Sequence, residues 1–387
     1  MGSCSIKDPS NVRKEISVHK SDFLILHPIG KGSFGRVWKI QNKKTNRFYA
    51  MKEMSKVIIY KKKAISSINQ ELHILSSLNN FFISNIHSAF QNEDNLYLIM
   101  DFFSGGDLRY HISKRSNKHF TEDETKFIIC NLLTALIYLR QNKIIHRDIK
   151  PENLVFDEIG YVHLTDFGIS KKIGKESVIV TSGTPSYMSP EAVLGKNQSY
   201  QSDYFSLGVL AYELIFGKRP YIGKTKGDIK RSLLCKSIKV EENDLPSYIK
   251  YNNKAAICDF VNKLLNRKVV SRIGANGIEE IMTHPWLEGF NWNELLNRKM
   301  KSPFVIRNED NYDIEAANRK EMYIDECQYE DILYQVNKAK LFNHFKLNRE
   351  CTENNIYCKK KNDIQIISSK CKIMKKDSIN SIMSTKA

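Results

Sequence analysis

Hydrophobic and polar residues alternate over short distances in the first part of the chain, and longer stretches with helical spacing dominate the second part. Alternation with a period of two, bounded by polar turns, predicts β-strands, whereas apolar residues three and four apart predict a helix. We predict one helix at 65–78, and strands at 23–29, 37–40, 48–51, 86–90 and 96–101. The polar run 42–46 is the expected turn between the second and third strands.

The glycine pair Gly105-Gly106 marks the change of pattern, and the chain after it is mostly helical as far as Gly289. A strand-rich part followed by a helix-rich part predicts an α+β fold of two lobes with a cleft between them. We expect a domain at 23–289, made of an N-terminal lobe (N-lobe) at 23–101, a hinge at 102–106 and a C-terminal lobe (C-lobe) at 107–289. Around it we expect a flexible start at 1–22, a tail with few apolar positions at 290–350, and a disordered basic stretch at 351–387.

Composition narrows the class of protein further. Hydrophobic residues make up 41% of the 387 residues, which suits a large buried core. No apolar run approaches the roughly 18 residues that span a bilayer. The net charge of +17 reflects either a general bias toward lysine or attraction to an anionic partner. Because the basic residues are spread rather than clustered, we expect no nucleic-acid partner. The eight cysteines form no CxxC pair and no zinc-ligand spacing, so we expect reduced thiols and a cytoplasmic location.

A dense group of chemically active residues lies in the second part of the chain. Its members are His146-Arg147-Asp148, Lys150, Asn153 and, thirteen residues after Asn153, Asp166-Phe167-Gly168. In-line transfer of a phosphoryl group to a hydroxyl needs a proton acceptor, a cation and magnesium ligands. We predict that Asp148 is the catalytic proton acceptor and that Lys150 is the catalytic cation. Asn153 and Asp166 are the predicted ligands of Mg²⁺, and His146 is expected to be a packed structural histidine.

A glycine-rich hairpin lies between the first two predicted strands and is the first part of a predicted ATP site. It consists of Ile29 and Gly30-Lys31-Gly32-Ser33-Phe34-Gly35. Glycines let backbone amides approach phosphate oxygens where a Cβ atom would collide. Lys52 is the candidate cation for those phosphates, and Glu71, in the predicted helix, is its candidate ion-pair partner. These motifs resemble those of protein kinases, and the resemblance implies the other ATP contacts. They are Val37 and Ala50 above the base, Met100, Asp101 and Phe103 near the hinge, Asp107 near the ribose and Leu154 below the base.

Together these motifs resemble a eukaryotic protein kinase, and the resemblance covers about 23–305. Lys150, two residues after Asp148, and Thr184 in Gly183-Thr184-Pro185 resemble serine/threonine kinases. The runs 105–111 and 298–304 resemble the AGC group, and the first of them is most similar to its YANK subfamily. This implies a protein kinase fold with a small β-rich N-lobe holding one main helix, a large helical C-lobe and an AGC-type C-terminal tail. It also implies ATP and Mg²⁺ as cofactors, protein substrates with Ser/Thr acceptors, and a monomer.

The same resemblance implies roles for residues outside the chemistry. Glu191 is expected to pair with Arg272, and Asp203 is expected to hold the backbone of the catalytic loop. Three acidic residues match positions that receive basic side chains of the substrate in the cyclic-nucleotide-dependent relatives. They are Asp107, Glu152 and Glu213. We therefore expect a preference for peptides with Arg or Lys before the acceptor.

The chain departs from the family pattern in two places. The family commonly has a phosphorylated Thr four residues before the counterpart of Thr184, and Val180 stands there. A phosphate that orders this segment through Arg147 would therefore sit on Thr181 or Ser182. In the tail, 342–345 has the two-aromatic spacing of a motif that docks on the small lobe. Two interpretations of this segment stay open: it docks on the small lobe, or it is an ordinary amphipathic segment.

The beginning of the chain carries a hint of lipid attachment. Gly2 and Cys4 are candidates for myristoylation and palmitoylation, which would give peripheral membrane contact, although Ile6 stands where Ser or Thr is usual. Two alternatives to an active protein kinase are a catalytically silent kinase-fold scaffold and a lipid or small-molecule kinase. The presence of Lys52 and Asp148 favours activity, and the long segment 166–191 favours a peptide substrate.

Overall fold

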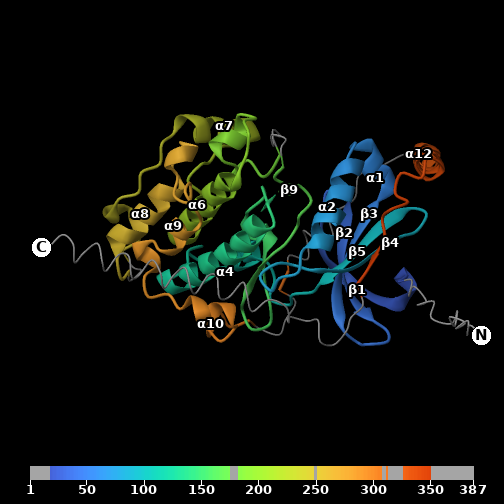
Figure 1. The fold of residues 1–387 in the computed structure, drawn as a ribbon, viewed down its shortest axis with the longest axis horizontal. Helices are drawn as coiled ribbons and strands as arrows, with labels where there is room; N and C mark the ends of the chain where they lie inside the picture. The colour runs from blue at the N-terminus through green and yellow to red at the C-terminus, as the bar shows by residue number, and fades with distance from the viewer. Residues whose placement is uncertain (1–17, 175–181, 248–250, 307–310, 313–325, 350–387) are drawn as a thin grey trace, which may run out of the picture.

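A computed structural model of the protein describes residues 18–174, 182–247, 251–306, 311–312 and 326–349 (Figure 1). It shows two lobes, one built around a β-sheet and one built of helices, so the predicted α+β fold is confirmed. The expectations for 351–387, most of those for 1–22, and the candidate positions Gly2, Cys4 and Thr181 lie outside the described residues. Within the described part of the chain, no helix combines the length and apolar character that crossing a membrane requires.

The N-lobe is built on an antiparallel sheet in the order β1-β2-β3-β5-β4-β10. Its strands are β1 (Phe23–Lys31), β2 (Gly35–Asn42), β3 (Phe48–Ser55), β4 (Ile86–Gln91), β5 (Asn95–Asp101) and β10 (Leu347–Asn348). Two helices accompany the sheet, α1 (Lys56–Lys61) and α2 (Ile65–Ser77), and a 3₁₀-helix η1 (Lys20–Asp22) precedes it. The predicted helix and the five predicted strands are all confirmed.

The turn between β2 and β3 shows why the alternating pattern breaks where it does. The side chain of Asn42 accepts hydrogen bonds from the backbone N–H of Lys44, at 3.0 Å, and of Thr45, at 2.9 Å. Asn46 has a φ of 55°, a left-handed conformation that asparagine adopts more readily than most residues. This polar run therefore forms a tight turn and sets the register in which Val37 faces Lys52.

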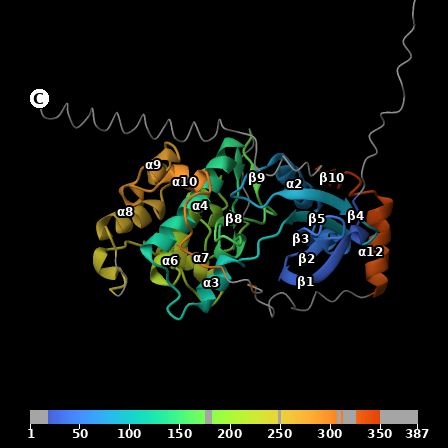
Figure 2. The same cartoon turned by 90° about the horizontal axis from the view of Figure 1, so that it is seen from below.

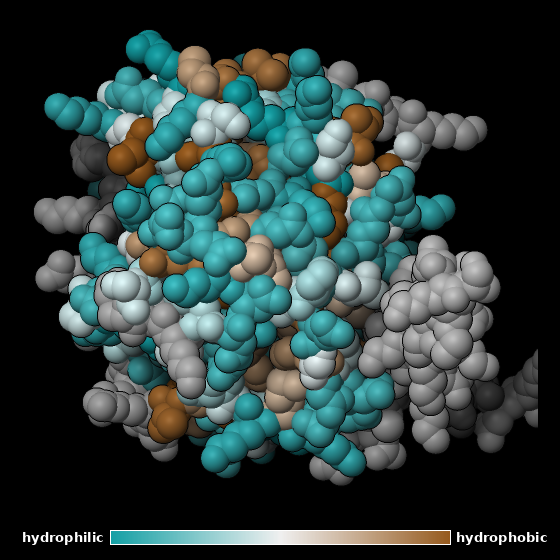
Figure 3. Space-filling view, turned by 90° about the vertical axis from the view of Figure 1, so that its left-hand side faces the viewer, coloured by the Kyte–Doolittle hydropathy of each residue, from teal (hydrophilic) through white to brown (hydrophobic). Residues whose placement is uncertain are grey.

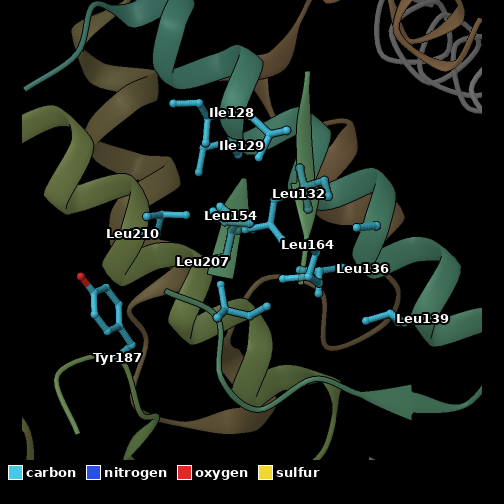
Figure 4. Close-up of a cluster of buried hydrophobic side chains, with 14 of the residues drawn as sticks. Ile128, Ile129, Leu132, Leu136, Leu139, Leu154, Leu164, Tyr187, Leu207 and Leu210 are labelled. Carbon is cyan, nitrogen blue, oxygen red and sulfur yellow. The ribbon is translucent and has the colours of Figure 1, made fainter. Parts of the chain in front are cut away.

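The C-lobe is built around α4 and α6, whose buried sides form its core with two short strands (Figure 4). Its helices are α3 (Leu108–Lys114), α4 (Glu122–Gln141), α5 (Pro190–Val193), α6 (Tyr200–Phe216), α7 (Lys226–Cys235), α8 (Lys254–Leu264), α9 (Glu279–Met282) and α10 (Trp292–Leu296). The described connections between them include the 3₁₀-helices η2 (Pro151–Asn153), η3 (Glu242–Asp244), η4 (Val269–Ser271) and η5 (Pro285–Leu287). The end of this lobe is mostly hydrophilic, with single hydrophobic side chains scattered over it (Figure 3).

Among the described residues, four short strands interrupt the helical part, and the sequence pattern does not predict them. They are β6 (Ile144–Ile145), β7 (Leu154–Phe156), β8 (Val162–Leu164) and β9 (Lys171–Lys172). Strands of two or three residues are too short to show an alternating pattern. They pair as β6 with β9 and β7 with β8, and these pairings bring the loop at 146–153 next to Asp166.

The described part of the tail returns to the N-lobe. Helix α12 (Glu326–Lys338) lies beside α1, and β10 adds a strand to the edge of the sheet at β4 (Figures 1 and 2). Phe342 is 3% exposed and Phe345 is 1% exposed, and both belong to the main hydrophobic core. Of the two alternatives left open for these aromatic residues, the structure therefore supports docking. No separate third core is present among the described residues, because the tail contributes to the existing one.

Candidate active site

The loop that carries the candidate catalytic residues is held in place from α6. The carboxylate of Asp203 accepts hydrogen bonds from the backbone N–H of His146 and of Arg147, both at 2.8 Å. Arg147 has a φ of 70°, which is a strained conformation for a residue with a Cβ atom. The two hydrogen bonds hold the loop in that conformation, so the expected role of Asp203 is confirmed. Burial raises the pKa of Asp203 to about 6.

His146 is packed in the interior of the C-lobe. It is fully buried, and its Nε2 lies 3.1 Å from the backbone oxygen of Thr165. Burial lowers the pKa of His146 to about 4, so the ring is neutral near pH 7. These features support the expectation that it is a structural histidine.

Three side chains, those of Lys150, Asn153 and Thr184, meet around Asp148. Its Oδ2 lies 2.5 Å from Nζ of Lys150, and its Oδ1 accepts hydrogen bonds from the hydroxyl of Thr184, at 2.8 Å, and from the backbone N–H of Thr184, at 3.1 Å. Lys150 Nζ also donates to Thr184 Oγ1 at 3.1 Å, and Asn153 Nδ2 donates to the backbone oxygen of Asp148 at 2.9 Å. The structure therefore brings the candidate base, cation and amide together with the threonine from the later segment.

A second group of charges joins the two lobes. Lys52 Nζ lies 2.6 Å from Glu71 Oε1 and 3.3 Å from Asp166 Oδ1, and this links β3, α2 and the segment after β8. Burial alone would lower the pKa of Lys52, but the two carboxylates outweigh it and raise that pKa. The charge of Lys52 in turn holds the pKa of Asp166 below its ordinary value. Burial raises the pKa of Glu71, and the charge of Lys52 acts against this shift. The contact of 2.6 Å between Lys52 and Glu71 confirms the predicted pairing of these two side chains.

The three glycines of the hairpin differ in what requires them. A Cβ atom on Gly35 would lie 2.0 Å from the backbone oxygen of Glu53, so protein packing alone demands glycine there. A Cβ atom on Gly30 or Gly32 would meet no atom closer than 3.8 Å, and neither has a positive φ. Packing therefore does not explain Gly30 and Gly32, whereas close approach of a phosphate group to the backbone would.

The rest of the hairpin is tied to the N-lobe. Ile29 is the extra residue of a β-bulge, and Lys31 is paired with Arg36 in the β-ladder. The ammonium group of Lys62 lies 2.6 Å from the backbone oxygen of Ser33 and 5.5 Å from the ring centre of Phe34.

The hinge side of the candidate nucleotide site agrees only in part with the prediction. Ala50 and Met100 are neighbours across β3 and β5, as two residues near an adenine ring would be. The carboxylate of Asp101 is already engaged by His87 and Asn85, and the ring of Phe103 stacks on His163 at 4.0 Å. Only the backbones of Asp101 and Phe103 remain as candidate contacts.

The side chains of Asp107 and Leu154 lie in different surroundings: one caps a helix, and the other is buried. Asp107 caps α3 by accepting a hydrogen bond from Tyr110 N at 2.7 Å, which leaves its second oxygen as the candidate for the ribose. The prediction that Leu154 lines the pocket is wrong, because its side chain is buried in the C-lobe core and has no surface exposed to solvent (Figure 4). Side chains alternate across a strand, so Val155, which is partly exposed, lies on the other face of β7 and is the better candidate.

The residues at this site fit a magnesium ion bound together with a nucleotide. Among the described residues, no group of three or more His, Cys, Asp and Glu side chains could hold a metal ion without other ligands. Mg²⁺ is usually bound by one or two protein oxygens together with substrate phosphates and water. Asp166, whose side chain is 48% exposed, and Asn153 have the donor chemistry that this requires.

The segment that carries Thr184 is fastened at its far end. Glu191 forms a two-pronged ion pair with Arg272, with N–O distances of 2.8 and 3.0 Å, as predicted. Near its beginning, Arg147 donates from Nε to the backbone oxygen of Ile169 at 2.7 Å. Arg147 Nη1 and the hydroxyl of Ser182 are buried without a hydrogen-bond partner among the described residues.

Sequence reasoning also missed Arg109, which lies on α3. Its guanidinium group is paired with Glu152 and Glu213, two of the three acids that were expected to receive basic side chains of a substrate. The expected preference for basic peptides therefore does not follow from these glutamates, because they already have a cation. An arginine two residues after Asp107 was the available signal, but only the tertiary structure places it between them.

The two lobes, the charged link through Lys52 and the cluster around Asp148 are the features of a protein kinase. The match of residues 23–287 to the family model described as "Protein kinase domain" agrees, and the chain belongs to this family. The chain is 37% identical over 296 residues to human serine/threonine-protein kinase 32B, which covers 74% of this chain and 69% of that protein. It is 36% identical over 291 residues to serine/threonine-protein kinase sgk-1 of Caenorhabditis elegans, covering 74% of this chain and 60% of sgk-1.

A third relative shows how much longer such proteins can be. Protein kinase 3 of Dictyostelium discoideum is 36% identical over 309 residues, which is 76% of this chain but 33% of the relative. The chain thus spans between one third and about two thirds of the length of these relatives.

Proposed function

We propose that this protein is an active serine/threonine protein kinase, which transfers the γ-phosphoryl group of Mg-ATP to Ser or Thr hydroxyls of protein substrates. One observation carries the proposal: Lys52 of the N-lobe contacts both Glu71 and Asp166, and Asp148 is in contact with Lys150 and Thr184. Protein kinases need the lysine–glutamate pair and the magnesium-binding aspartate in place at the same time. The names of the relatives, which include two serine/threonine-protein kinases, support the same conclusion.

Each residue of the cluster has a proposed role. Asp148 orients the acceptor hydroxyl and takes its proton, since its carboxylate stands at the centre of the cluster. Lys150 neutralises charge that develops on the transferred group, and the hydroxyl of Thr184 aligns both side chains. Lys52 holds the non-transferred phosphates, and Glu71 fixes the position of its ammonium group.

The metal and the nucleotide complete this arrangement. Asn153 and Asp166 would hold Mg²⁺, which supplies charge neutralisation between the phosphates when it is bound. The glycine hairpin would cover the phosphates, with Gly30 and Gly32 presenting backbone amides. The adenine would lie between Val37 and Ala50 on one side and Val155 on the other.

The finer classification is also a proposal. We infer membership of the AGC group and greatest similarity to its YANK subfamily from the run 105–111 and from the tail that packs on the N-lobe. We place the kinase domain at 23–289 and the tail at 290–350. Acylation of Gly2 and Cys4, with peripheral membrane contact, and a monomeric state stay predictions.

The decisive experiment compares turnover of purified protein with that of an Asp166→Asn variant. Removing the carboxylate should lower kcat at least about 100-fold, because metal-assisted charge stabilisation contributes several kcal/mol to such a transition state. Asp259→Asn is the matched control, since this carboxylate is half-exposed on α8, at the end of the C-lobe (Figure 1). A wild-type protein that binds ATP but phosphorylates no protein would instead support the alternative of a catalytically silent scaffold.

A further inference from the structure

Arg109 connects three elements through its guanidinium group. Nε lies 2.9 Å from Glu152 Oε1, and Nη1 lies 2.9 Å from Glu213 Oε1. Nη2 donates to the hydroxyl of Tyr187 at 2.5 Å and lies 3.5 Å from Glu213 Oε2. The Tyr187 hydroxyl also donates to Glu213 Oε2. Every nitrogen of the guanidinium is therefore engaged, and both oxygens of Glu213 are occupied.

This cluster lies beside the proposed acceptor site. Lys150 and Thr184 both contact Asp148. Glu152 is two residues after Lys150 in the sequence, and Tyr187 is three residues after Thr184, so both lie on the segments that carry these contacts. The side chain of Arg109 is 31% exposed and that of Glu152 is 43% exposed, whereas that of Glu213 is 5% exposed. A bound peptide could therefore reach the arginine and Glu152, while Glu213 lies beneath them.

The geometry is the one that an arginine of a substrate would need. A guanidinium binds carboxylates through a planar fork of N–H groups, and here the protein supplies that fork itself. A peptide arginine at this place would have to displace Arg109, which would leave a partly buried cation without its partners. It would also approach a like charge, which disfavours binding.

A second arginine, which follows α6 in the chain, contacts the segment that carries Tyr187. Arg219 Nη1 donates to the hydroxyl of Ser186 at 2.7 Å, next to Tyr187. Two arginines thus accompany the two glutamates at this surface. The cluster is close to electrically neutral, and no acidic pair remains to attract a basic peptide.

We propose that Arg109 fills the subsite for basic substrate residues from within, so that the kinase selects non-basic side chains there. Arg109 is then a specificity-determining residue, and the substrates are proteins whose Ser or Thr is not preceded by an essential Arg or Lys. The inference rests on the proposed kinase function, and it replaces the preference for basic peptides that the three acids alone suggested.

The first test measures kcat/KM on a peptide library that varies the residues before a Ser/Thr acceptor, with wild type and Arg109→Gln. Glutamine removes the charge but can still donate to Glu213, which protects the fold. Wild type should favour basic over neutral peptides by less than about 3-fold, and the variant should raise this ratio at least about 10-fold, since close charge pairs at interfaces couple by more than 1.4 kcal/mol. A wild-type enzyme with a strong basic preference, or an unchanged ratio in the variant, would overturn the proposal.

Two further variants separate charge from structure. Arg109→Lys keeps the positive charge and should retain the preference of wild type. The double variant Arg109→Gln/Glu213→Gln also removes the buried acidic partner that Arg109 covers, and it should lose the basic preference that the single variant gained. If the double variant keeps that preference, Glu213 is not the group that was freed, and the proposal fails.

The second test does not depend on turnover. A fluorescent peptide with arginines before an alanine in place of the acceptor is titrated by anisotropy against wild type and Arg109→Gln. The variant should bind it at least about 10-fold more tightly, on the same charge-pair argument. Equal affinity refutes the inference about Arg109. Absence of phosphorylation by wild type with any peptide would instead refute the proposed kinase function, so the two failures are distinguishable.

Discussion

The ion pair between Glu191 and Arg272 gives the sharpest prediction about stability. The side chain of Arg272 is not exposed at all, and that of Glu191 is 6% exposed. Arg272 also donates to the backbone oxygens of Gln201, at 2.5 Å, and of Asn266, at 2.8 Å. An Arg272→Leu substitution would leave the carboxylate of Glu191 buried with uncharged donors, among them the hydroxyl of Ser202 at 3.0 Å.

The expected cost follows from this burial. Removing one partner of a buried ion pair typically costs about 3–5 kcal/mol, because the other charge stays desolvated. Unfolding releases about 2.1 cal/mol/K of entropy per residue, or roughly 0.6 kcal/mol/K for a domain the size of residues 23–287. Arg272→Leu should therefore lower Tm by about 5–9 °C.

The assay is thermal unfolding by calorimetry, with two companion variants. Lys263→Met is the control, because both side chains of the ion pair between Lys263 and Asp259 are about half-exposed. Such exposed pairs contribute about 0–1 kcal/mol to the free energy of unfolding. The double variant Glu191→Gln/Arg272→Leu removes both charges and should recover a large part of the lost stability. A single variant as stable as the control, or a double variant no better than the single, would refute the reasoning.

The pH dependence of the same variants provides a second check. Burial alone would raise the pKa of Glu191, but the hydrogen bonds and charge of Arg272 outweigh it and lower the pKa below the ordinary value of 4.5. A carboxyl group with a lowered pKa in the folded state stabilises the protein above its unfolded pKa, and this contribution is lost as the pH falls through the folded value. The difference in Tm between wild type and Arg272→Leu should therefore be full above about pH 5.5 and should shrink below pH 4.5. A difference that grows on acidification would contradict this sign.

Three more predictions concern activity and the tail. Lys52→Met should lower kcat at least about 100-fold in a phosphotransfer assay, since the phosphates lose their cation while the fold, followed by circular dichroism, persists. Phe345→Ala should cost about 3–5 kcal/mol of local stability, because the ring is 1% exposed, and hydrogen exchange at β10 should increase while exchange in α6 is unchanged. If a phosphate orders the segment before Thr184, the double variant Thr181→Ala/Ser182→Ala should have lower turnover than wild type, and unchanged turnover would exclude both sites.

The regular elements of the N-lobe could be predicted from the sequence because their signals are local. Alternation over six to nine residues and the polar turn at Asn42 specify strands and their ends without reference to the rest of the chain. The short strands β6 to β9 could not be predicted, because two or three residues carry no periodic signal. The error at Leu154 has the same origin, since a shift of one residue in a strand changes the face on which a side chain lies.

The sequence by itself determined the chemical groups of the candidate site, because their identities and spacing are properties of the chain. Only the tertiary structure decided how those groups are used. Arg109 meets Glu213 across 104 residues, and Phe342 reaches the N-lobe at Gln91 across 251 residues. Such contacts depend on how helices, loops and tail pack, and no local pattern records them. For that reason the site of phosphoryl transfer is legible in the sequence, whereas the partner of each glutamate and the place of the tail are properties of the fold.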